Sequence, residues 1–136
     1  MAIAEGRTLQ FVGPEQIDVA VLETFDYEGP AQEIVTETNE FTAVCPYSGL
    51  PDFARLTIAY VPDRRCVELK SLKYYVTSFR SVGIFQEHAT ARIAEDLYRL
   101  LAPRKLTIRT VYHVRGGFET TCSVTLPSRQ ESGGSE

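Results

Sequence analysis

The chain has 136 residues, which fits one domain, and 43% of them are hydrophobic, enough for a core without disulfides or metals to staple it. Its formal net charge is −4, from 14 Lys and Arg against 18 Asp and Glu. Because there is no overall basic excess to neutralise phosphates, this balance argues against direct binding to nucleic acid, although a local basic patch could hold one small anion.

The first 38 residues are expected to form an N-terminal arm, mostly loop with at most one short element. Their hydrophobic periodicity is weak, and the dipeptides Gly13-Pro14 and Gly29-Pro30 are typical turn signals. A single folded domain is expected over residues 39–127. The last residues, 128–136, are polar and rich in glycine, and we expect them to be disordered.

The domain opens with two predicted strands. The first is the alternating run Glu40–Val44, and the second is Ala54–Val61, where Leu56, Ile58 and Tyr60 share one face. The segment between them contains two prolines and a glycine and is therefore expected to be a rigid turn.

Two helices are predicted after these strands. Ser71 is a suitable N-cap for a helix that runs to about Arg80. One apolar stripe of this helix is formed by Leu72, Tyr75, Val76 and Phe79. The second helix is expected from about Phe85 to Leu101. Its end is set by Pro103, which cannot continue a helix.

Two further strands complete the predicted fold. Apolar and polar residues alternate in Lys105–Val114 and in Phe118–Leu126, and the sequence Arg115-Gly116-Gly117 between them is typical of a hairpin turn. The order strand-strand-helix-helix-strand-strand predicts an α+β domain, an antiparallel four-stranded sheet with two helices on one face. Such a sheet has unpaired edges that neighbouring subunits can cover, so we expect a homo-oligomer.

The three cysteines, Cys45, Cys66 and Cys122, do not show the close spacing of a zinc site. The odd count, with no basic-then-apolar export signal at the N-terminus, predicts a cytoplasmic protein without a disulfide framework. No apolar run approaches the ~20 residues that span a bilayer, so no membrane partner is expected.

Cys122 lies on the apolar face of a predicted strand, where a thiol is usually a small buried hydrophobe. Cys66 follows two arginines that could lower its pKa, but a structural role is expected.

Cys45 is the thiol best placed for chemistry. It stands where a strand ends and a rigid turn begins, which gives a nucleophile partial exposure and a fixed direction. Asp52 closes the same turn, and a partly desolvated carboxyl can carry protons near neutral pH. The alternative is a buried thiol beside an Asp that caps its own turn. Neither His88 nor His113 is placed by its spacing to complete a triad or a zinc site.

A second group of candidate residues lies in Glu68–Tyr75, where charged and aromatic side chains meet at the start of the first predicted helix. Lys70 and Lys73 are either solvated or, together with backbone N–H groups, attract an anion such as phosphate. Arg80 and Arg115 could add to that site. The sequence contains no Gly-x-Gly-x-x-Gly motif and no P-loop, so a nucleotide would bind without a Rossmann unit.

Glu87 is a third candidate, at the start of the second predicted helix. A Glu in the first turn is often only a partner of the helix dipole. It could also accept two hydrogen bonds from the edge of a purine-like ring, with Phe85 as a stacking face.

Four stretches, VCPYSGLPDF, ELKSLKYY, FQE and the RGG hairpin, resemble in this order and spacing the NADPH-dependent 7-cyano-7-deazaguanine reductases. These are nitrile reductases in the pathway to the modified tRNA base queuosine. The likeness covers about residues 37–125, and ELKSLKYY meets the family's NADPH-associated signature at every position. The chain length suits the short, single-module type.

The resemblance implies a tunnelling fold, in which subunits join into a barrel and bind purine- or pterin-like rings between them. It further implies the cofactor NADPH, the substrate 7-cyano-7-deazaguanine, and active sites between the subunits of a homo-oligomer. No metal is needed for the implied reaction.

The resemblance also implies roles for individual residues. Cys45 matches the nucleophile that forms a thioimide with the nitrile carbon, and Asp52 matches the proton donor to the nitrile nitrogen. Glu87 matches the anchor of the deazaguanine edge. Further substrate contacts are implied at Val67, Glu68, Leu69 and Gln86, and NADPH contacts at Lys70, Lys73 and Arg115.

One position departs from the family pattern, because many members have histidine where this chain has Gln86. Glutamine does not titrate near pH 7, so a proton task of that histidine would pass to Asp52 or to water. Three alternatives stay open at this stage: a relative that delivers ammonia to the same nitrile, a zinc-dependent cyclohydrolase, and a non-catalytic interaction module.

Overall fold

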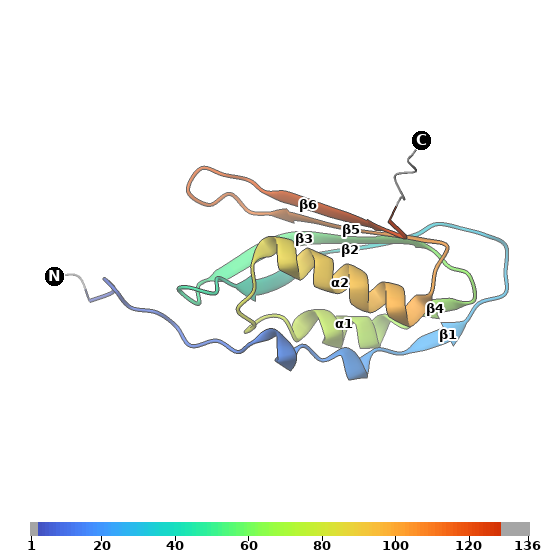
Figure 1. The fold of residues 1–136 in the computed structure, drawn as a ribbon, viewed down its shortest axis with the longest axis horizontal. Helices are drawn as coiled ribbons and strands as arrows, with labels where there is room; N and C mark the ends of the chain where they lie inside the picture. Colours follow the sequence, from blue (N-terminus) through green and yellow to red (C-terminus); the bar gives the residue numbers. More distant parts are fainter. Residues whose placement is uncertain (1–2, 129–136) are drawn as a thin grey trace.

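The computed structural model describes residues 3–128 (Figure 1). In chain order its elements are the 3-10 turns η1 (Pro14–Gln16) and η2 (Val19–Val21), strands β1 (Thr24–Asp26), β2 (Ile34–Val44), β3 (Pro51–Val61) and β4 (Arg65–Val67), helices α1 (Leu69–Thr77) and α2 (Gln86–Leu101), and strands β5 (Lys105–Tyr112) and β6 (Thr121–Leu126).

The main sheet has the strand order β2-β3-β5-β6, and every neighbouring pair is antiparallel. Both helices cover the same face of this sheet (Figure 1). The alternation expected from the sequence is confirmed, since Leu56, Ile58 and Tyr60 of β3 are buried against the helices. The predicted α+β fold is therefore confirmed, with β2 and β6 as the two edge strands.

The N-terminal 38 residues contain more regular structure than the expected loop. Strand β2 already begins at Ile34, and β1 pairs with β4 in a separate two-stranded sheet. The early part of β2 shows only weak hydrophobic alternation, because two of its half-buried positions are the threonines Thr36 and Thr38. The division into an arm over 1–38 and a domain over 39–127 stays a prediction. Most of the tail predicted to be disordered lies outside the described residues.

Helix α1 begins three residues earlier than predicted, and its N-cap is Glu68 rather than Ser71. The Glu68 carboxylate accepts hydrogen bonds from the N–H groups of Lys70 at 3.0 Å and of Ser71 at 2.7 Å. The Ser71 hydroxyl is buried inside the first turn, where it accepts from the N–H of Glu23 at 3.0 Å and donates to the carbonyl oxygen of Glu68. A longer side chain thus performs the capping that the sequence suggested for serine.

Strand β6 begins at Thr121, three residues later than predicted, and the inward position expected for Phe118 is wrong, because its side chain is 77% exposed. Cys122 is half-buried rather than fully buried. Cys122 is half-buried because β6 is an edge strand that packs against α2 (Figure 1). Phe118 lies before β6, in the hairpin that Arg115 and Phe118 close by mutual main-chain hydrogen bonds.

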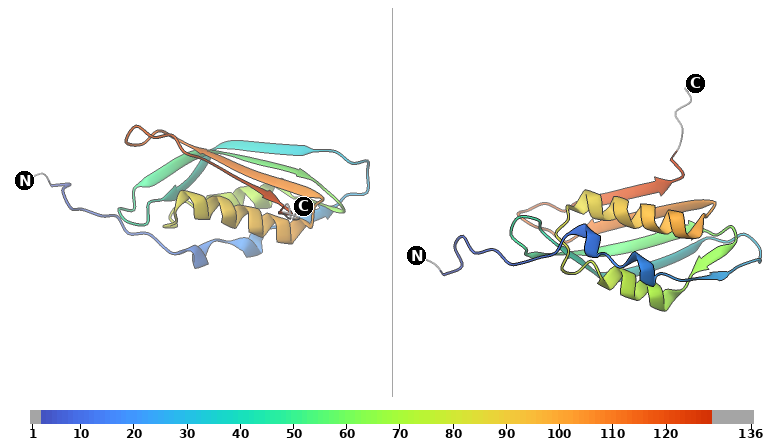
Figure 2. Two further views of the ribbon diagram at one scale, coloured as in Figure 1. Left: turned by 45° about the horizontal axis from the view of Figure 1, so that its top comes forward. Right: turned by 60° about the horizontal axis from the view of Figure 1, so that its bottom comes forward.

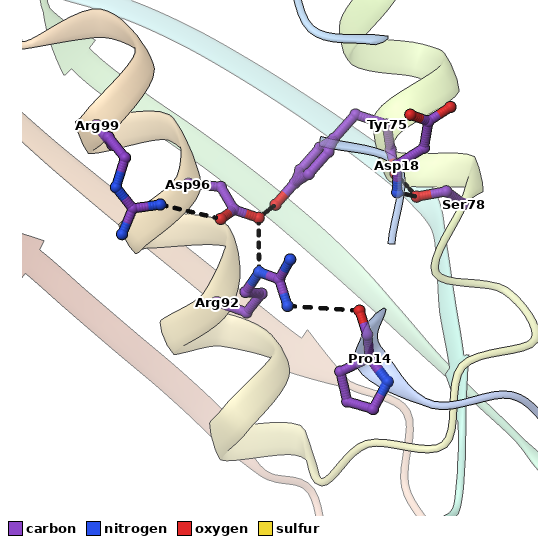
Figure 3. Close-up of polar contacts among 7 residues, drawn as sticks. All are labelled: Pro14, Asp18, Tyr75, Ser78, Arg92, Asp96 and Arg99. Atoms are coloured by element: carbon purple, nitrogen blue, oxygen red, sulfur yellow. Dashed lines mark hydrogen bonds and ion pairs between the residues drawn. The ribbon is translucent and has the colours of Figure 1, made fainter. Parts of the chain in front are cut away.

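A buried polar network joins the two helices to the arm (Figure 3). Tyr75 of α1 donates to Asp96 of α2 at 2.6 Å, and the Nε of Arg92 donates to the same carboxylate oxygen at 2.8 Å. The pKa of Tyr75 is raised mainly by burial and, to a smaller extent, by the hydrogen bond to Asp96. Because Arg92 also reaches the carbonyl oxygen of Pro14 at 3.5 Å, the arm is fastened along the helices.

Candidate active site

Cys45 directly follows β2, and the chain turns back within five residues to begin β3 at Pro51. The N–H of Cys45 donates to the carbonyl oxygen of Leu50, and the N–H of Gly49 donates to the carbonyl oxygen of Cys45, both at 2.9 Å. Gly49 has a φ of 76°, a left-handed conformation that glycine adopts without steric cost. The turn is thus closed by its own hydrogen bonds, as its prolines and glycine lead one to expect.

The Cys45 thiol is half-buried and faces donors of its own turn. Hydrogen bonds from the backbone of Ser48 and of Tyr47, whose nitrogen is 3.4 Å from Sγ, lower the pKa of Cys45 below its ordinary value of 9.0. The Ser48 hydroxyl and the Arg115 guanidinium lower this pKa further, and partial burial opposes them. The turn therefore favours the thiolate, the reactive form of cysteine.

Asp52 lies on β3, and its partner across the strand pair is Ala43 of β2, so Asp52 and Cys45 share one end of the sheet. The Asp52 residue is only 6% exposed, and its carboxylate forms an ion pair with Arg115. Within residues 3–128 no other group donates a hydrogen bond to Asp52 Oδ1. Arg115, which the resemblance assigns to NADPH, thus lies beside the two expected catalytic residues.

The start of α2 is tied to the Cys45 turn by main-chain bonds. The N–H of Val44 donates to the carbonyl oxygen of Val82 at 2.9 Å, and the N–H of Ile84 donates to the carbonyl oxygen of Val44 at 3.1 Å. The rings of Tyr47 and Phe85 meet edge to face, with centroids 5.7 Å apart. Two of the expected substrate-binding residues, Gln86 and Glu87, are therefore in the same region as Cys45, in the first turn of α2.

The two histidines take no part in this arrangement. His88 contacts the ring of Phe85 on the side of α2 that borders Pro14. His113 stacks on Phe53 with ring centroids 6.1 Å apart. Because neighbouring residues of a strand point to opposite faces, Phe53 and His113 lie on the open face of the sheet, whereas Asp52 points toward the helices.

A second set of expected site residues lies at the other end of the sheet, where β4 leads into α1 (Figure 2). The N–H of Val67 donates to the Tyr60 hydroxyl at 3.1 Å. Hydrogen bonds from the N–H groups of Ser71 and Lys70 lower the pKa of Glu68. Leu69 is half exposed, and Lys70 and Lys73 of the same helix are exposed.

These two sets are far apart within one chain. Asp52 and Tyr60 are eight residues apart on the continuous strand β3, which at ~3.3 Å per residue corresponds to roughly 26 Å. Figures 1 and 2 agree that the turn after β2 and the start of α2 lie at one end, and β4 with the start of α1 at the other. One small ligand cannot contact both sets in a single chain.

A groove of about 450 Å³ runs between the edge strand β2 and helix α1. Its lining includes Thr36 and Thr38 from β2 and Leu69, Leu72, Lys73 and Val76 from α1. Lys73 therefore provides a cation at the edge of the sheet, next to apolar side chains. Within residues 3–128 there is no group of three or more metal-binding side chains, and no helix there is long and apolar enough to cross a membrane.

The family model of the QueF-like proteins matches residues 51–131. A Thermotoga petrophila protein named NADPH-dependent 7-cyano-7-deazaguanine reductase is 48% identical over 134 residues, which cover 98% of each chain. This chain belongs to the QueF-like family. A Caldicellulosiruptor bescii member with the same name is 52% identical over 116 residues, or 84% of this chain and 88% of that one.

Among solved structures, the apo form of the archaeosine synthase QueF-Like matches with a TM-score of 0.65 over 76% of this chain and 100% of its own. At 18% identity this likeness concerns the fold alone. It places the sheet and helices described above in the fold of the QueF-like family.

Proposed function

We propose that this chain reduces the nitrile of 7-cyano-7-deazaguanine to give 7-aminomethyl-7-deazaguanine, by way of a covalent thioimide at Cys45, as a step toward queuosine in tRNA. The chain is an NADPH-dependent oxidoreductase of the QueF-like family, as the names of its relatives state for them. The observation that carries the proposed mechanism is the arrangement of Cys45, Asp52 and Arg115, a thiol with a lowered pKa beside a buried, ion-paired carboxylate.

Cys45 is assigned the first step. Its sulfur adds to the nitrile carbon, so that one carbon–sulfur bond forms and one carbon–nitrogen π bond breaks. Asp52, which is a carboxylate in its ion pair with Arg115, takes the thiol proton and passes it to the nitrile nitrogen. The sum is the addition of S–H across the triple bond, and the product is a thioimide that accepts hydride far more readily than a nitrile.

NADPH supplies one hydride to the substrate carbon in each of two reductions. After the first, loss of the Cys45 thiolate leaves an imine, and after the second, one further proton completes the aminomethyl group. Two NADPH molecules would be consumed for each nitrile, and a proton from solvent returns the released Cys45 thiolate to the thiol. Lys73, an exposed cation in the lining of the groove along β2, and Lys70, which is exposed on the same helix, are suited in charge to the phosphates of NADPH.

The proposed substrate site is shared between two subunits. Glu87 would anchor the deazaguanine edge beside Cys45, with Gln86 as its neighbour in the first turn of α2. Val67, Glu68 and Leu69 lie at the opposite end of the same chain, so a second copy must supply them. The unpaired edges of β2 and β6 offer the surfaces on which copies could join into a barrel.

The reductase activity is tested by following NADPH absorbance with purified protein and the nitrile. We expect oxidation of two NADPH per nitrile, and its loss in Cys45→Ala. Cys122→Ala is a matched control, because Cys122 is a half-buried thiol on β6, away from the turn. Equal oxidation by Cys45→Ala would remove Cys45 from the mechanism.

A second candidate function, which the sequence left open, is transfer of ammonia to the same nitrile; the structural neighbour named an archaeosine synthase shares only its fold with this chain. The sequence identity of 48% and 52% to proteins named as reductases, against 18% to that synthase, favours reduction. Product formation that requires ammonia and leaves NADPH unoxidised would replace the reductase proposal by this one.

A further inference from the structure

The N-terminal arm crosses the Cys45 turn in an extended conformation. The N–H of Leu9 donates to the carbonyl oxygen of Ser48 at 2.8 Å. Three residues later, the N–H of Val12 donates to the carbonyl oxygen of Ser81, and the N–H of Gly83 donates to that of Val12, both at 2.8 Å. The arm is thus bonded both to the turn and to the segment that leads into α2.

Two glycines make room for this path. A Cβ atom on Gly49 would lie 2.3 Å from the carbonyl oxygen of Leu9, and one on Gly83 would lie 2.3 Å from the ring of Phe11. Gly49 is also required by its positive φ, but Gly83 has no such conformational reason. At Gly83 the close approach of the arm is therefore the physical reason for glycine.

We propose that the arm, through the main chain of Leu9, positions Ser48 and so holds the Cys45 turn in its reactive geometry. Ser48 is fixed from two sides, since Leu9 binds its carbonyl oxygen and the N–H of Leu50 donates to its hydroxyl at 3.1 Å. Ser48 and its neighbour Tyr47, whose nitrogen is 3.4 Å from Sγ, are the residues of the turn whose hydrogen bonds favour the thiolate of Cys45. Leu9 is thus a positioning residue, and this role rests on the proposed nucleophile Cys45.

The titratable and charged groups at this end of the molecule come from several elements. Asp52 lies on β3, Arg115 lies between β5 and β6, and Glu87 and His88 belong to the first turn of α2. In the arm itself, Glu5 and Arg7 precede Leu9. A change at the amide of Leu9 leaves all of these groups in the chain, so a change in thiol reactivity would report on the hydrogen bond.

The test compares two proline substitutions in the full-length protein. Leu9→Pro removes the N–H that binds Ser48, whereas Thr8→Pro places the same ring one residue earlier, where the amide forms no hydrogen bond among residues 3–128. The rate of Cys45 alkylation by iodoacetamide is followed against pH, with the modified cysteine located by mass spectrometry. We expect Leu9→Pro to move the midpoint to higher pH and to slow alkylation at pH 7 by roughly three- to tenfold, the factor that one net hydrogen bond corresponds to. An unshifted profile in folded Leu9→Pro, or an equal shift in Thr8→Pro, would overturn the proposal.

Amide hydrogen exchange on the unaltered protein keeps the proposal testable even if Leu9→Pro does not fold. The Leu9 amide should be protected to the same degree as that of Gly49, whereas the amide of Gln10 should exchange rapidly. Fast exchange at Leu9 would contradict the proposal. The alkylation and exchange measurements require no NADPH and no nitrile. Their outcome is therefore independent of whether the proposed reduction takes place.

Discussion

Arg115 forms an ion pair with the buried carboxylate of Asp52 at the end of the sheet, next to the Cys45 turn. The side chain of Asp52 is 8% exposed and that of Arg115 is 46% exposed, so the ion pair joins a buried carboxylate to a partly solvated guanidinium. The resemblance assigns these two residues to different tasks, proton donation and NADPH binding. Their contact suggests that the charge of Arg115 also serves the proton transfer by Asp52.

Replacing Arg115 by alanine should impair catalysis, because it leaves the buried Asp52 carboxylate without its ion-pair partner. A hydrogen-bonded charge partner contributes about 2 kcal/mol, so we expect kcat/KM for the nitrile to fall roughly 30-fold. Arg109→Ala is the matched control, since Arg109 is exposed on β5. Steady-state kinetics of both variants check this, and wild-type kinetics in Arg115→Ala would contradict it.

The Ser48 hydroxyl should measurably tune the thiol of Cys45. It is one of the groups that lower the pKa of Cys45, so its removal in Ser48→Ala should raise that pKa toward 9.0. Since the thiolate then forms only at higher pH, alkylation at pH 7 should slow and the whole pH profile should move upward. Ser123→Ala, at an exposed site on β6, should leave the profile in place. A downward or absent shift in Ser48→Ala would show that its hydroxyl does not stabilise the thiolate.

Glu68 should stabilise the fold as the N-cap of α1, apart from any role in substrate binding. Its pKa is lowered by the N–H groups of Ser71 and Lys70, so its contribution is fully present above its unfolded value near 4.5. The contribution is lost as pH falls through the lowered folded value. Glu68→Ala should therefore melt below wild type at pH 7, and the gap in Tm should narrow in acid below 4.5. Glu95→Ala on the exposed face of α2 is the control, and a gap independent of pH would argue against capping by the carboxylate.

Two inactive variants should complement each other if each site is shared between subunits. Cys45→Ala removes the nucleophile at one end of the chain, and Glu68→Gln changes the substrate-contact group at the other while leaving an oxygen to cap α1. We expect each variant alone to be inactive, and co-expressed chains to regain part of the NADPH oxidation activity in mixed oligomers. If the co-expressed pair is no more active than either variant, the site is not divided between copies as proposed.

Local patterns in the sequence were sufficient to predict most of the fold. The inner faces of β3 and β5 alternate without interruption, and Pro103 marks the end of α2 at Leu101. The turn residues around Gly49 also correctly place Cys45 and Asp52 at one end of the sheet. These features depend on residues close together in the chain, which is why periodicity and turn chemistry reveal them.

Features that depend on distant contacts were not predictable in the same way. The pairing of Arg115 with Asp52 follows from the sheet register, and the contact of Leu9 with Ser48 follows from the path of the arm. Glu68 was missed as a cap because serine is the commoner N-cap residue and Ser71 stands three residues later. In the sequence, the spacing of Glu68 and Ser71, three residues apart, is the signal that could have indicated the earlier start. In the structure, both side chains form hydrogen bonds with the first turn of α1.

The proposed mechanism depends above all on a covalent bond between Cys45 and the nitrile carbon. Intact-protein mass spectrometry of the protein mixed with 7-cyano-7-deazaguanine in the absence of NADPH tests this bond directly. We predict a mass increase of one substrate molecule per chain, located at Cys45 by peptide mapping, absent in Cys45→Ala and discharged when NADPH is added. Nitrile-dependent NADPH oxidation by a protein that never forms this adduct would contradict the proposed mechanism.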